Sequence, residues 1–331
     1  MLGHWYIACR SSQLGRQPLA RTILDEPLAV FRETSGRAAA VADRCPHRHL
    51  ALSRGRVTDK GLRCAYHGWT WDAEGRCTDI PASCATAESY SRLKVAAKPV
   101  KEAQGFIWVW MGAGEPEREP LEFPRFNHDG WHHWVMERVF EGSGFNCVEN
   151  FLDVPHTAHV HRGLFRGDES HEIEIEITSG EDWIQAEFVN EKRMDSIIGK
   201  LLVPADAKIL HTDRFQLPYV TRVDYRMTDT RQYIVMSQCT PESSDRTRVF
   251  TYMAYRFSPF GPLVRLVFDP LSRLILDQDV KVIAQQTADI KRTGPPRFLY
   301  WETDAIARGI RDLLDGKSLA GRAPERKSLR A

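Results

Sequence analysis

The sequence predicts an α+β protein of two domains. An all-β domain is expected at residues 1–115, and a domain in which helices flank a curved antiparallel sheet is expected at residues 116–331. Short strands separated by glycine and proline fill the first third, which is typical of a small β sandwich. Alternating strands and then two long helical stretches fill the rest, which indicates an α+β arrangement. The run 112–120 between them has no hydrophobic period, so we place the domain boundary there.

In the first domain, strands are predicted where apolar residues run between turn residues. The clearest are Leu28–Phe31, Ala38–Val41 and Phe106–Met111. The last of these is apolar on both faces, as expected for a strand buried inside a sandwich.

In the second domain, hydrophobic alternation is the main signal. His171–Thr178 places Ile173, Ile175 and Ile177 on one face, as a half-buried strand does. Further strands are predicted at Trp134–Glu141, Trp183–Val189, Phe215–Met227, Tyr233–Cys239 and Arg248–Phe257. Helices are predicted at Leu263–Arg292 and Trp301–Leu314, and the basic tail from Lys317 is expected to be solvated and frayed.

Composition excludes several classes of protein. The net charge of +1 gives no reason to expect nucleic acid or a membrane surface as partner. No apolar run approaches the length of a transmembrane helix, and residues 1–6 lack the layout of a signal peptide. The seven cysteines are odd in number and scattered, which does not resemble a disulfide framework, so we expect a reducing cytoplasm.

Two short segments of the first domain each carry one cysteine and one histidine. Cys45-Pro46-His47 is followed, after sixteen intervening residues, by Cys64-Ala65-Tyr66-His67. A Rieske [2Fe–2S] cluster takes two cysteines on one iron and two histidines on the other. A zinc finger uses the same residue types, but it puts both cysteines in one knuckle and both histidines in the other. The mixed loops therefore favour the iron–sulfur cluster.

A second group of metal-binding residue types lies in Glu149–His161, which holds three histidines and two carboxylates. Two histidines and one carboxylate bind ferrous iron as a facial triad that leaves positions open for oxygen. The alternative is a polar helix face with hydrogen-bonded histidines. The density of histidines beside acids favours the metal site.

Helical geometry leaves two histidines as rivals for the second ligand. His156 and His161 are separated by about 140° on a regular helix, so they can bind one metal only if the helix ends or bulges between them. His156 and His159 would share a face without distortion.

Asn150, Asp153, His156 and His161 form the string N-x-x-D-x-x-H-x-x-x-x-H. This string resembles the iron site of Rieske non-heme iron oxygenases. The two cysteine–histidine segments and the Gly68-Trp69 that follows them match the same family, so the resemblance spans most of the chain. The chain is similar in particular to the monooxygenases and oxidative demethylases of this family, such as vanillate and dicamba demethylases.

The resemblance implies the ligands of both metal centres. The cluster would be bound by Cys45, His47, Cys64 and His67, while His49 is not a family ligand and is expected to be a loop histidine. The mononuclear iron would be bound by His156, by His161 rather than His159, and by an aspartate of a C-terminal helix. Leu276–Ile283 matches the family string for that helix, and Asp279 fits it better than Asp277. Both acids could equally be exposed carboxylates at a helix start.

Two further residues have expected roles beside the iron. Asp153 is predicted to accept a hydrogen bond from the imidazole N–H of His156 and so to fix its tautomer. In the family, the corresponding aspartate also reaches a cluster histidine of the neighbouring subunit, which implies a head-to-tail homotrimer. Asn150 is expected to line the iron pocket one turn earlier.

These features predict the oxygenase component of a Rieske monooxygenase that hydroxylates or oxidatively demethylates a hydrophobic small molecule with O2. The sequence has no G-x-G-x-x-G loop, flavin motif or plant-type ferredoxin cysteine set, so a separate NAD(P)H-dependent reductase of the flavin/ferredoxin type is expected. The apolar stretch Met194–Leu210 is a candidate lid over the substrate pocket, and the alternative for any single apolar residue in it is packing in the core.

Two alternative functions follow from the same motifs. One is the alpha subunit of an aromatic-ring cis-dihydroxylating dioxygenase. The other, from a different class, is an electron-transfer or zinc-structural protein without oxygen chemistry. Leu50 and Tyr66 stand where respiratory Rieske proteins carry disulfide cysteines, which argues against the electron-transfer alternative.

Overall fold

The computed structural model describes residues 1–90, 92–162, 172–191, 209–258, 261 and 263–330. Contacts between residues group the chain into two compact units. Unit 1 comprises Met1–Glu122 and Thr240–Ser244, and unit 2 comprises Phe123–Cys239 and Asp245–Ala331. The predicted domain boundary after residue 115 lies a few residues before this division and stays a prediction. Most of the candidate lid lies outside the described residues.

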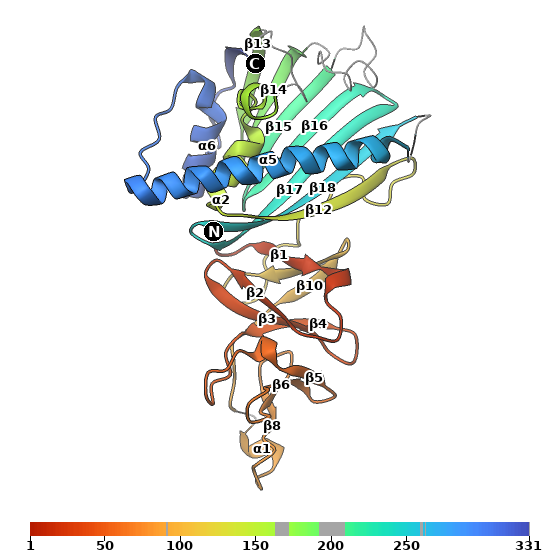
Figure 1. Cartoon of the computed structure of the whole chain (residues 1–331), viewed down its shortest axis with the longest axis vertical. Helices are drawn as coiled ribbons and strands as arrows, with labels where there is room; N and C mark the ends of the chain where they lie inside the picture. The colour runs from red at the N-terminus through yellow and green to blue at the C-terminus, as the bar shows by residue number, and fades with distance from the viewer. Residues whose placement is uncertain (91, 163–171, 192–208, 259–260, 262, 331) are drawn as a thin grey trace. The chain divides into compact units, whose positions relative to one another are not determined.

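Unit 1 consists of three small antiparallel sheets (Figure 1). The first has the order β1 (Trp5–Arg10), β11 (Phe106–Trp110), β10 (Val100–Ala103). The second has the order β2 (Leu19–Ile23), β3 (Glu26–Arg32), β4 (Ala38–Ala42), β9 (Ala97–Lys98). The third has the order β5 (Arg56–Thr58), β6 (Gly61–Arg63), β7 (Thr70–Trp71), β8 (Cys77–Asp79). Short helices lie at η1 (Ser11–Gln13), η2 (Leu52–Arg54) and α1 (Ala87–Tyr90).

Buried strands hold unit 1 together. Every residue of β11 is buried, as its uniformly apolar sequence predicts, and five of the six residues of β1 are buried beside it. Another cluster of buried side chains joins Cys45 and Cys64 of the cysteine–histidine loops to Phe31, Leu62 and Trp71. The loops themselves follow β4 and β6, so short paired strands fix their ends.

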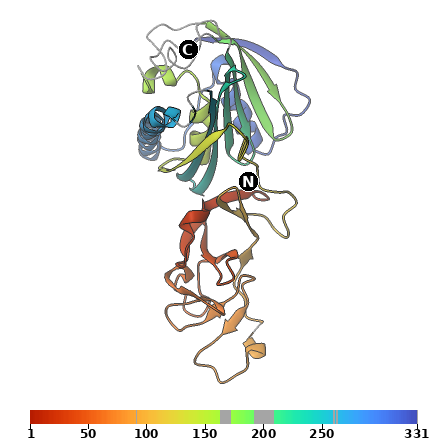
Figure 2. The same cartoon turned by 90° about the vertical axis from the view of Figure 1, so that its right-hand side faces the viewer.

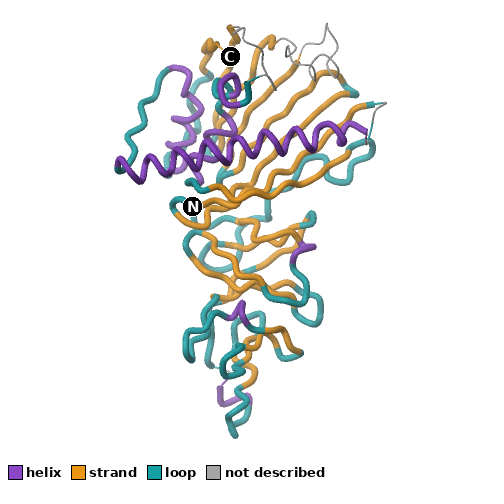
Figure 3. The backbone as a smooth tube through the Cα atoms, in the orientation of Figure 1, coloured by secondary structure: helices purple, strands orange, loops and turns teal. Residues whose placement is uncertain are grey.

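Unit 2 is built on one eight-stranded antiparallel sheet, which Figure 3 shows with the helices that cross it. Its order is β12 (His132–Phe140), β18 (Arg246–Phe257), β17 (Arg231–Ser243), β16 (Val220–Thr228), β15 (Ile209–Gln216), β14 (Trp183–Glu191), β13 (Glu172–Ser179), β19 (Glu325–Arg330). Ile173, Ile175 and Ile177 are all buried, so the predicted alternation in β13 is confirmed. No helix among the described residues is both long enough and apolar enough to cross a membrane.

The helices of unit 2 pack on this sheet, and Figure 2 views the longest of them nearly end-on beside the strands. Among the described residues they are α2 (Gly144–Leu152), α3 (Thr157–Val160), α5 (Leu263–Thr293), η3 (Glu302–Asp304) and α6 (Ala305–Leu314). Ser143 caps α2 by accepting a hydrogen bond from the N–H of Asn146 at 3.1 Å. The buried residues of α5 recur every three or four positions and include Leu276, Asp279 and Ile283, so Asp279 lies on the face that packs inward.

Three predictions about unit 2 were wrong in detail. The strand expected at Phe215–Met227 is two strands, because Pro218 has no N–H for a sheet ladder and Tyr219 takes a positive φ of 58° in the turn between them. The second predicted helix begins at Ala305 rather than at Trp301, after a short 3₁₀ turn.

The C-terminal tail is the third correction. Residues Glu325–Arg330 form β19, which pairs with β13 at the edge of the sheet, rather than a frayed end. Lys327 lies opposite Ile175, and Arg326 pairs with Glu176 at 3.6 Å. Charged residues are typical of edge strands, so the polar composition that suggested a frayed tail fits an edge strand equally well.

Candidate active site

The two cysteine–histidine loops of unit 1 share one backbone design. The N–H of Cys45 donates to the carbonyl of Leu50, and the N–H of Cys64 donates to that of Trp69, both at 2.9 Å. The residue four positions after each cysteine donates back to the cysteine carbonyl, at 2.8 Å in the first loop and 3.1 Å in the second. Each loop therefore closes on itself and presents one thiol and one imidazole.

These loops bring the four predicted cluster ligands together. Cys45, His47, Cys64 and His67 line one small hollow, and the two imidazole rings lie 4.5 Å apart between centroids. Cys45 and Cys64 are buried, whereas His67 is exposed. Trp69, two residues after His67, stacks on His47 with the ring centroids 4.6 Å apart.

The donor set of this hollow fits a cationic iron–sulfur group. Burial raises the pKa of the Cys45 thiol, and the neighbouring Cys64 adds to the shift, so two thiolates would not coexist here without a metal. The Nδ1 atom of His47 is buried and has no hydrogen-bond partner among the described residues. Burial, together with the positive charges of His67 and Arg48, lowers the pKa of His47 and so favours the neutral imidazole that a metal needs.

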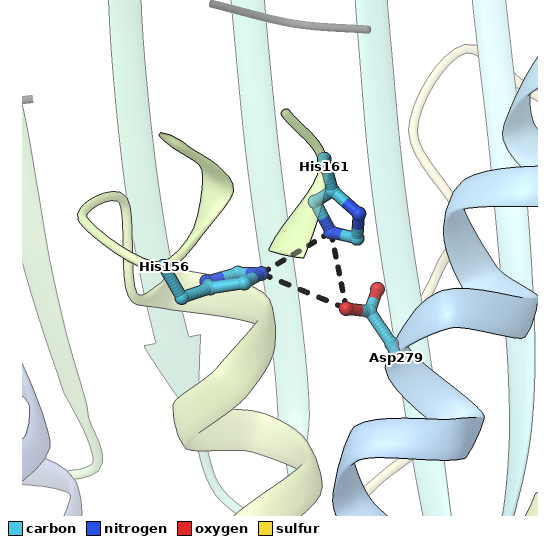
Figure 4. A group of neighbouring side chains, drawn as sticks. All are labelled: His156, His161 and Asp279. Atoms are coloured by element: carbon cyan, nitrogen blue, oxygen red, sulfur yellow. Dashed lines mark hydrogen bonds and ion pairs between the residues drawn. The ribbon is translucent and has the colours of Figure 1, made fainter. Parts of the chain in front are cut away.

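In unit 2, His156, His161 and Asp279 form a compact group of possible metal ligands (Figure 4). Their donor atoms all lie within 4.8 Å of one another. The Oδ1 atom of Asp279 is 3.6 Å from Nε2 of His156 and 3.1 Å from Nε2 of His161, and the two Nε2 atoms are 3.3 Å apart. The group thus has the composition and spacing of a two-histidine, one-carboxylate iron site.

The local chain path explains how two histidines five residues apart can converge. Helix α2 ends at Leu152, and His156 and His161 flank the single turn α3 rather than lying within one regular helix. α3 ends at Val160, and His161 takes a non-helical conformation with φ −107° and ψ 30°, so the predicted helix end between the two histidines is confirmed. Asp279 comes from the middle of α5, more than one hundred residues later.

Charges in the group favour a bound cation. Burial opposes ionisation of Asp279, yet its contacts with His156 and His161 lower the pKa of the carboxyl. Burial likewise lowers the pKa of His156, but the carboxylates of Asp279 and Asp153 raise it overall. A carboxylate that stays ionised beside two imidazoles at low exposure is a donor set suited to a divalent metal.

Each of the two histidines donates a hydrogen bond from Nδ1, which turns its Nε2 atom toward the metal-binding group. Nδ1 of His161 donates to Oε1 of Gln278 at 2.8 Å. Nδ1 of His156 donates to the backbone carbonyl of Asp153, while the Asp153 carboxylate is 3.7 Å away. The expectation that the Asp153 carboxylate accepts this hydrogen bond was therefore wrong, because the backbone carbonyl oxygen of Asp153 accepts it instead. The sequence analysis assigned no role to Gln278, although this residue belongs to the string that pointed to Asp279.

The two rival residues lie outside the group. His159 is exposed on α3, and it is not among the residues around the three donor atoms. Asp277 is 56% exposed at its side chain and pairs with Arg138 at 2.7 Å. Two positions along a helix turn a side chain by about 200°, which explains why Asp277 and Asp279 point to different sides.

Acids cluster beside the same turn. Glu149, Asp153 and Asp304 line a small hollow next to His156. Burial, together with the charge of Asp153, raises the pKa of Glu149 to about 7, and burial also raises that of Asp153.

The metal-binding group opens into a cavity of about 180 Å³. Asn150 lines it, as predicted, and its Oδ1 atom is buried with no hydrogen-bond partner among the described residues. The cavity walls come from α2, α5 and strands β12, β16, β17 and β18, and most of the lining surface is apolar. Such a pocket beside convergent polar groups is the expected form of a small-molecule site.

Comparison with known proteins agrees with this geometry. Residues 4–93 match the sequence model of the Rieske [2Fe–2S] domain, and residues 146–318 match that of the vanillate O-demethylase oxygenase C-terminal domain. The second match covers more than half of the chain.

Curated relatives include oxygenase components. The chain is 35% identical over 189 residues to the dicamba O-demethylase oxygenase component of Stenotrophomonas maltophilia. The aligned region covers 55% of this chain and 54% of that protein. It is 26% identical to the vanillate O-demethylase oxygenase subunit of Pseudomonas sp. (strain HR199 / DSM 7063), covering 94% and 93% of the two chains. The match to the vanillate enzyme is nearly full-length, whereas the chain spans only about half the length of the curated relatives to which it is 35–37% identical.

A solved structure shows the same fold. Dicamba monooxygenase bound to dicamba superposes with a TM-score of 0.79 and 24% identity, covering 95% of this chain and 96% of that one. The Rieske domain carries a [2Fe–2S] cluster, and the oxygenases of the matching family use mononuclear iron. With a Rieske domain followed by a vanillate O-demethylase oxygenase domain, the chain belongs to the family of Rieske non-heme iron oxygenases.

Proposed function

We propose that the protein is the oxygenase component of a Rieske monooxygenase, which hydroxylates or oxidatively demethylates a small hydrophobic molecule with O2. The observation that carries this proposal is the group of His156, His161 and Asp279 at the wall of an apolar cavity. The names of relatives that demethylate dicamba and vanillate support demethylation as one outcome of hydroxylation.

The residues proposed to hold the two groups follow from the geometry. Cys45, His47, Cys64 and His67 would hold the cluster, and the group of two histidines and Asp279 would hold ferrous iron. When bound, the cluster would supply single electrons and the iron would supply a site for the reductive activation of O2. The protein orients the ligands through Gln278 and the Asp153 carbonyl, and its apolar walls exclude water from the substrate.

Three further features belong to this proposal. A separate flavin/ferredoxin-type reductase would supply the electrons, since the sequence has no nucleotide-binding motif of its own. The active form would be a head-to-tail homotrimer in which the exposed His67 of one copy meets Asp153 of the next, so that electrons pass between subunits. A cytoplasmic location is supported by the seven cysteines, all of which lie in described positions and none of which forms a disulfide there.

The test is O2 consumption by the protein loaded with both metal centres and reduced by a one-electron donor. Addition of a methoxylated aromatic substrate should start O2 uptake, and removal of the mononuclear iron should stop it. Labelled O2 should place one oxygen atom, not two, in the product. Incorporation of two atoms would support the dioxygenase alternative, and a colourless zinc-containing protein would exclude both oxygenases.

Light scattering should give the mass of a trimer, and a fully active monomer would contradict the proposed electron path.

A further inference from the structure

The sheet face beside the metal-binding group is ordered in rows of like side chains. In the register of β16 and β17, Thr221 lies opposite Ser237, Val223 opposite Val235, and Tyr225 opposite Tyr233. On β18, Thr251 and Met253 continue the first two rows, since Oγ of Ser237 lies 3.0 Å from Oγ1 of Thr251. All eight residues line the cavity, because alternate residues of a strand face the same side.

The first row, which we call the hydroxyl row, comprises Thr221, Ser237 and Thr251. Their exposed fractions are only 2%, 3% and 3%. A hydroxyl removed from water is costly unless it finds a hydrogen-bond partner. The bond between Ser237 and Thr251 uses one of three O–H donors, so the row retains donors and acceptors for a molecule inside the cavity.

Asn150 adds a polar group from the helical wall. It is 6% exposed, it lines the cavity, and its Oδ1 atom has no hydrogen-bond partner among the described residues. A buried amide oxygen requires a donor. Alcohols, phenols and amides supply one, whereas an ionised carboxylate or sulfonate has no hydrogen to donate.

Apart from the metal-binding group, the cavity wall carries no cationic side chain that could receive an anion, within the part that the structure describes. No lysine or arginine is among those lining residues, and the one acid is Asp279 of the metal-binding group. Burial raises the pKa of Tyr233 well above its usual range, so this phenol stays neutral. An anionic group buried without a cationic partner is strongly disfavoured.

Size sets a further limit. An engineered protein cavity of about 150 Å³ holds benzene. The cavity here measures about 180 Å³, which suits one ring with small substituents.

We propose that the cavity binds an uncharged, single-ring molecule with a hydroxyl or N–H group, which is held by hydrogen bonds to the hydroxyl row and Asn150, and that it discriminates against carboxylates and sulfonates. This inference rests on the proposed function for the identity of the site. It adds the substrate class and the residues that select it.

The test compares two ligands that differ in one group, 4-methoxybenzyl alcohol and 4-methoxybenzoate. Calorimetric titration of the full-length protein with both metal centres, without reductant, measures binding apart from turnover. The alcohol should bind at least about tenfold more tightly, a difference of about 1.4 kcal/mol. Equal or tighter binding of the benzoate overturns the inference, and so does failure of the alcohol to bind at millimolar concentration.

Variants test the hydroxyl row directly. Thr221→Val and Ser237→Ala each remove a hydroxyl with little change of shape and should weaken binding of the alcohol about fivefold. Their affinity for methoxybenzene, which has no hydroxyl, should change less than twofold. Val235→Ile in the next row is the matched packing control and should preserve the preference for alcohol over benzoate. If Thr221→Val and Ser237→Ala weakened binding of the alcohol and of methoxybenzene by the same factor, the proposal would be contradicted.

The two proposals fail in different ways. O2 uptake with the benzoate in preference to the alcohol would overturn the substrate class while supporting the oxygenase. Tighter binding of the alcohol, with no O2 uptake by the reduced enzyme, would support the binding site and contradict the oxygenase.

Discussion

His49 and Gly68 occupy the same position in the two cysteine–histidine loops. Each stands four residues after the loop cysteine, donates its N–H to that cysteine's carbonyl and takes a left-handed φ, 60° for His49 and 74° for Gly68. The backbone of the site is thus a repeated motif, although only one of the two residues is a glycine.

This equivalence predicts opposite responses to substitution. His49→Gly should retain the cluster and change the free energy of unfolding by less than about 1 kcal/mol, since glycine takes this conformation freely. Gly68→Ala should destabilise unit 1 by about 1–2 kcal/mol from the backbone alone, and more because the new Cβ would lie 2.9 Å from Cγ of Pro81. Chemical denaturation and the visible spectrum of the cluster measure both effects. A stable, fully loaded Gly68→Ala protein would contradict the strain argument.

Loss of a cluster ligand should remove the cluster altogether. Cys64→Ser and His67→Ala should abolish the brown colour and the Rieske electron-paramagnetic signal, because each removes a donor to one iron. His49→Ala serves as the control, since His49 is exposed and is not proposed as a ligand. A normal signal in both ligand variants would disprove the assignment.

Loss of an iron ligand should leave the cluster in place. His156→Ala, His161→Ala and Asp279→Ala should each lose mononuclear iron, since three donors are the minimum for this site. The matched controls, His159→Ala and Asp277→Ala, should keep it. Metal analysis and the cluster spectrum give both readouts, and iron loss in a control variant would move the assignment to that residue.

Gln278 should tune the iron site through His161. Gln278→Leu removes the acceptor of the Nδ1–H bond, so iron affinity should fall about 10- to 100-fold while the cluster spectrum stays unchanged. Gln278→Glu keeps an acceptor oxygen and should retain affinity closer to that of the unmodified protein. Iron titration of the apoprotein measures the difference. Equal affinity in the Leu variant would show that the hydrogen bond does not matter.

Asp153 should affect turnover more than metal binding. Asp153→Asn keeps the backbone carbonyl that orients His156, so both metal centres should remain. The variant removes the negative charge proposed to face His67 of the neighbouring copy, and turnover should fall by orders of magnitude while the reductase still reduces the cluster. Rapid-mixing spectroscopy separates cluster reduction from turnover. Full activity would rule out this electron path.

Glu149 should make stability depend on pH. Its pKa rises from 4.5 in the unfolded chain to about 7 in the folded protein, so the folded state retains a proton that the unfolded state loses between these values. The free energy of unfolding should therefore decrease as pH rises from 4.5 to about 7 and then level off. Glu149→Gln should remove this part of the decrease, as measured by denaturation at several pH values. An unchanged pH profile would contradict the shift.

Local patterns in the sequence were sufficient for much of this protein. The alternation at Ile173, Ile175 and Ile177 predicted strand β13, and the long stretch of helical periodicity predicted helix α5. In both cases burial of one face imposes a fixed spacing on the apolar residues. The spacing of Cys45, His47, Cys64 and His67 predicted the cluster loops, since the four residues fall in two short segments and this donor set is specific to one kind of cluster.

Other features depended on contacts between distant segments, which sequence spacing does not encode. The tail paired with β13 because an edge strand accepts charged residues, so its composition could not separate a strand from a frayed end. Bare helical geometry left His159 and His161 as rivals, and the end of α3 at Val160, directly before His161, decided which imidazole meets Asp279. The hydroxyl row of Thr221, Ser237 and Thr251 forms only through the pairing register of strands β16, β17 and β18. The sequence by itself therefore determined the residue types of the metal centres, whereas the tertiary structure decided their convergence and the character of the cavity, because both require segments far apart in the chain to pack together.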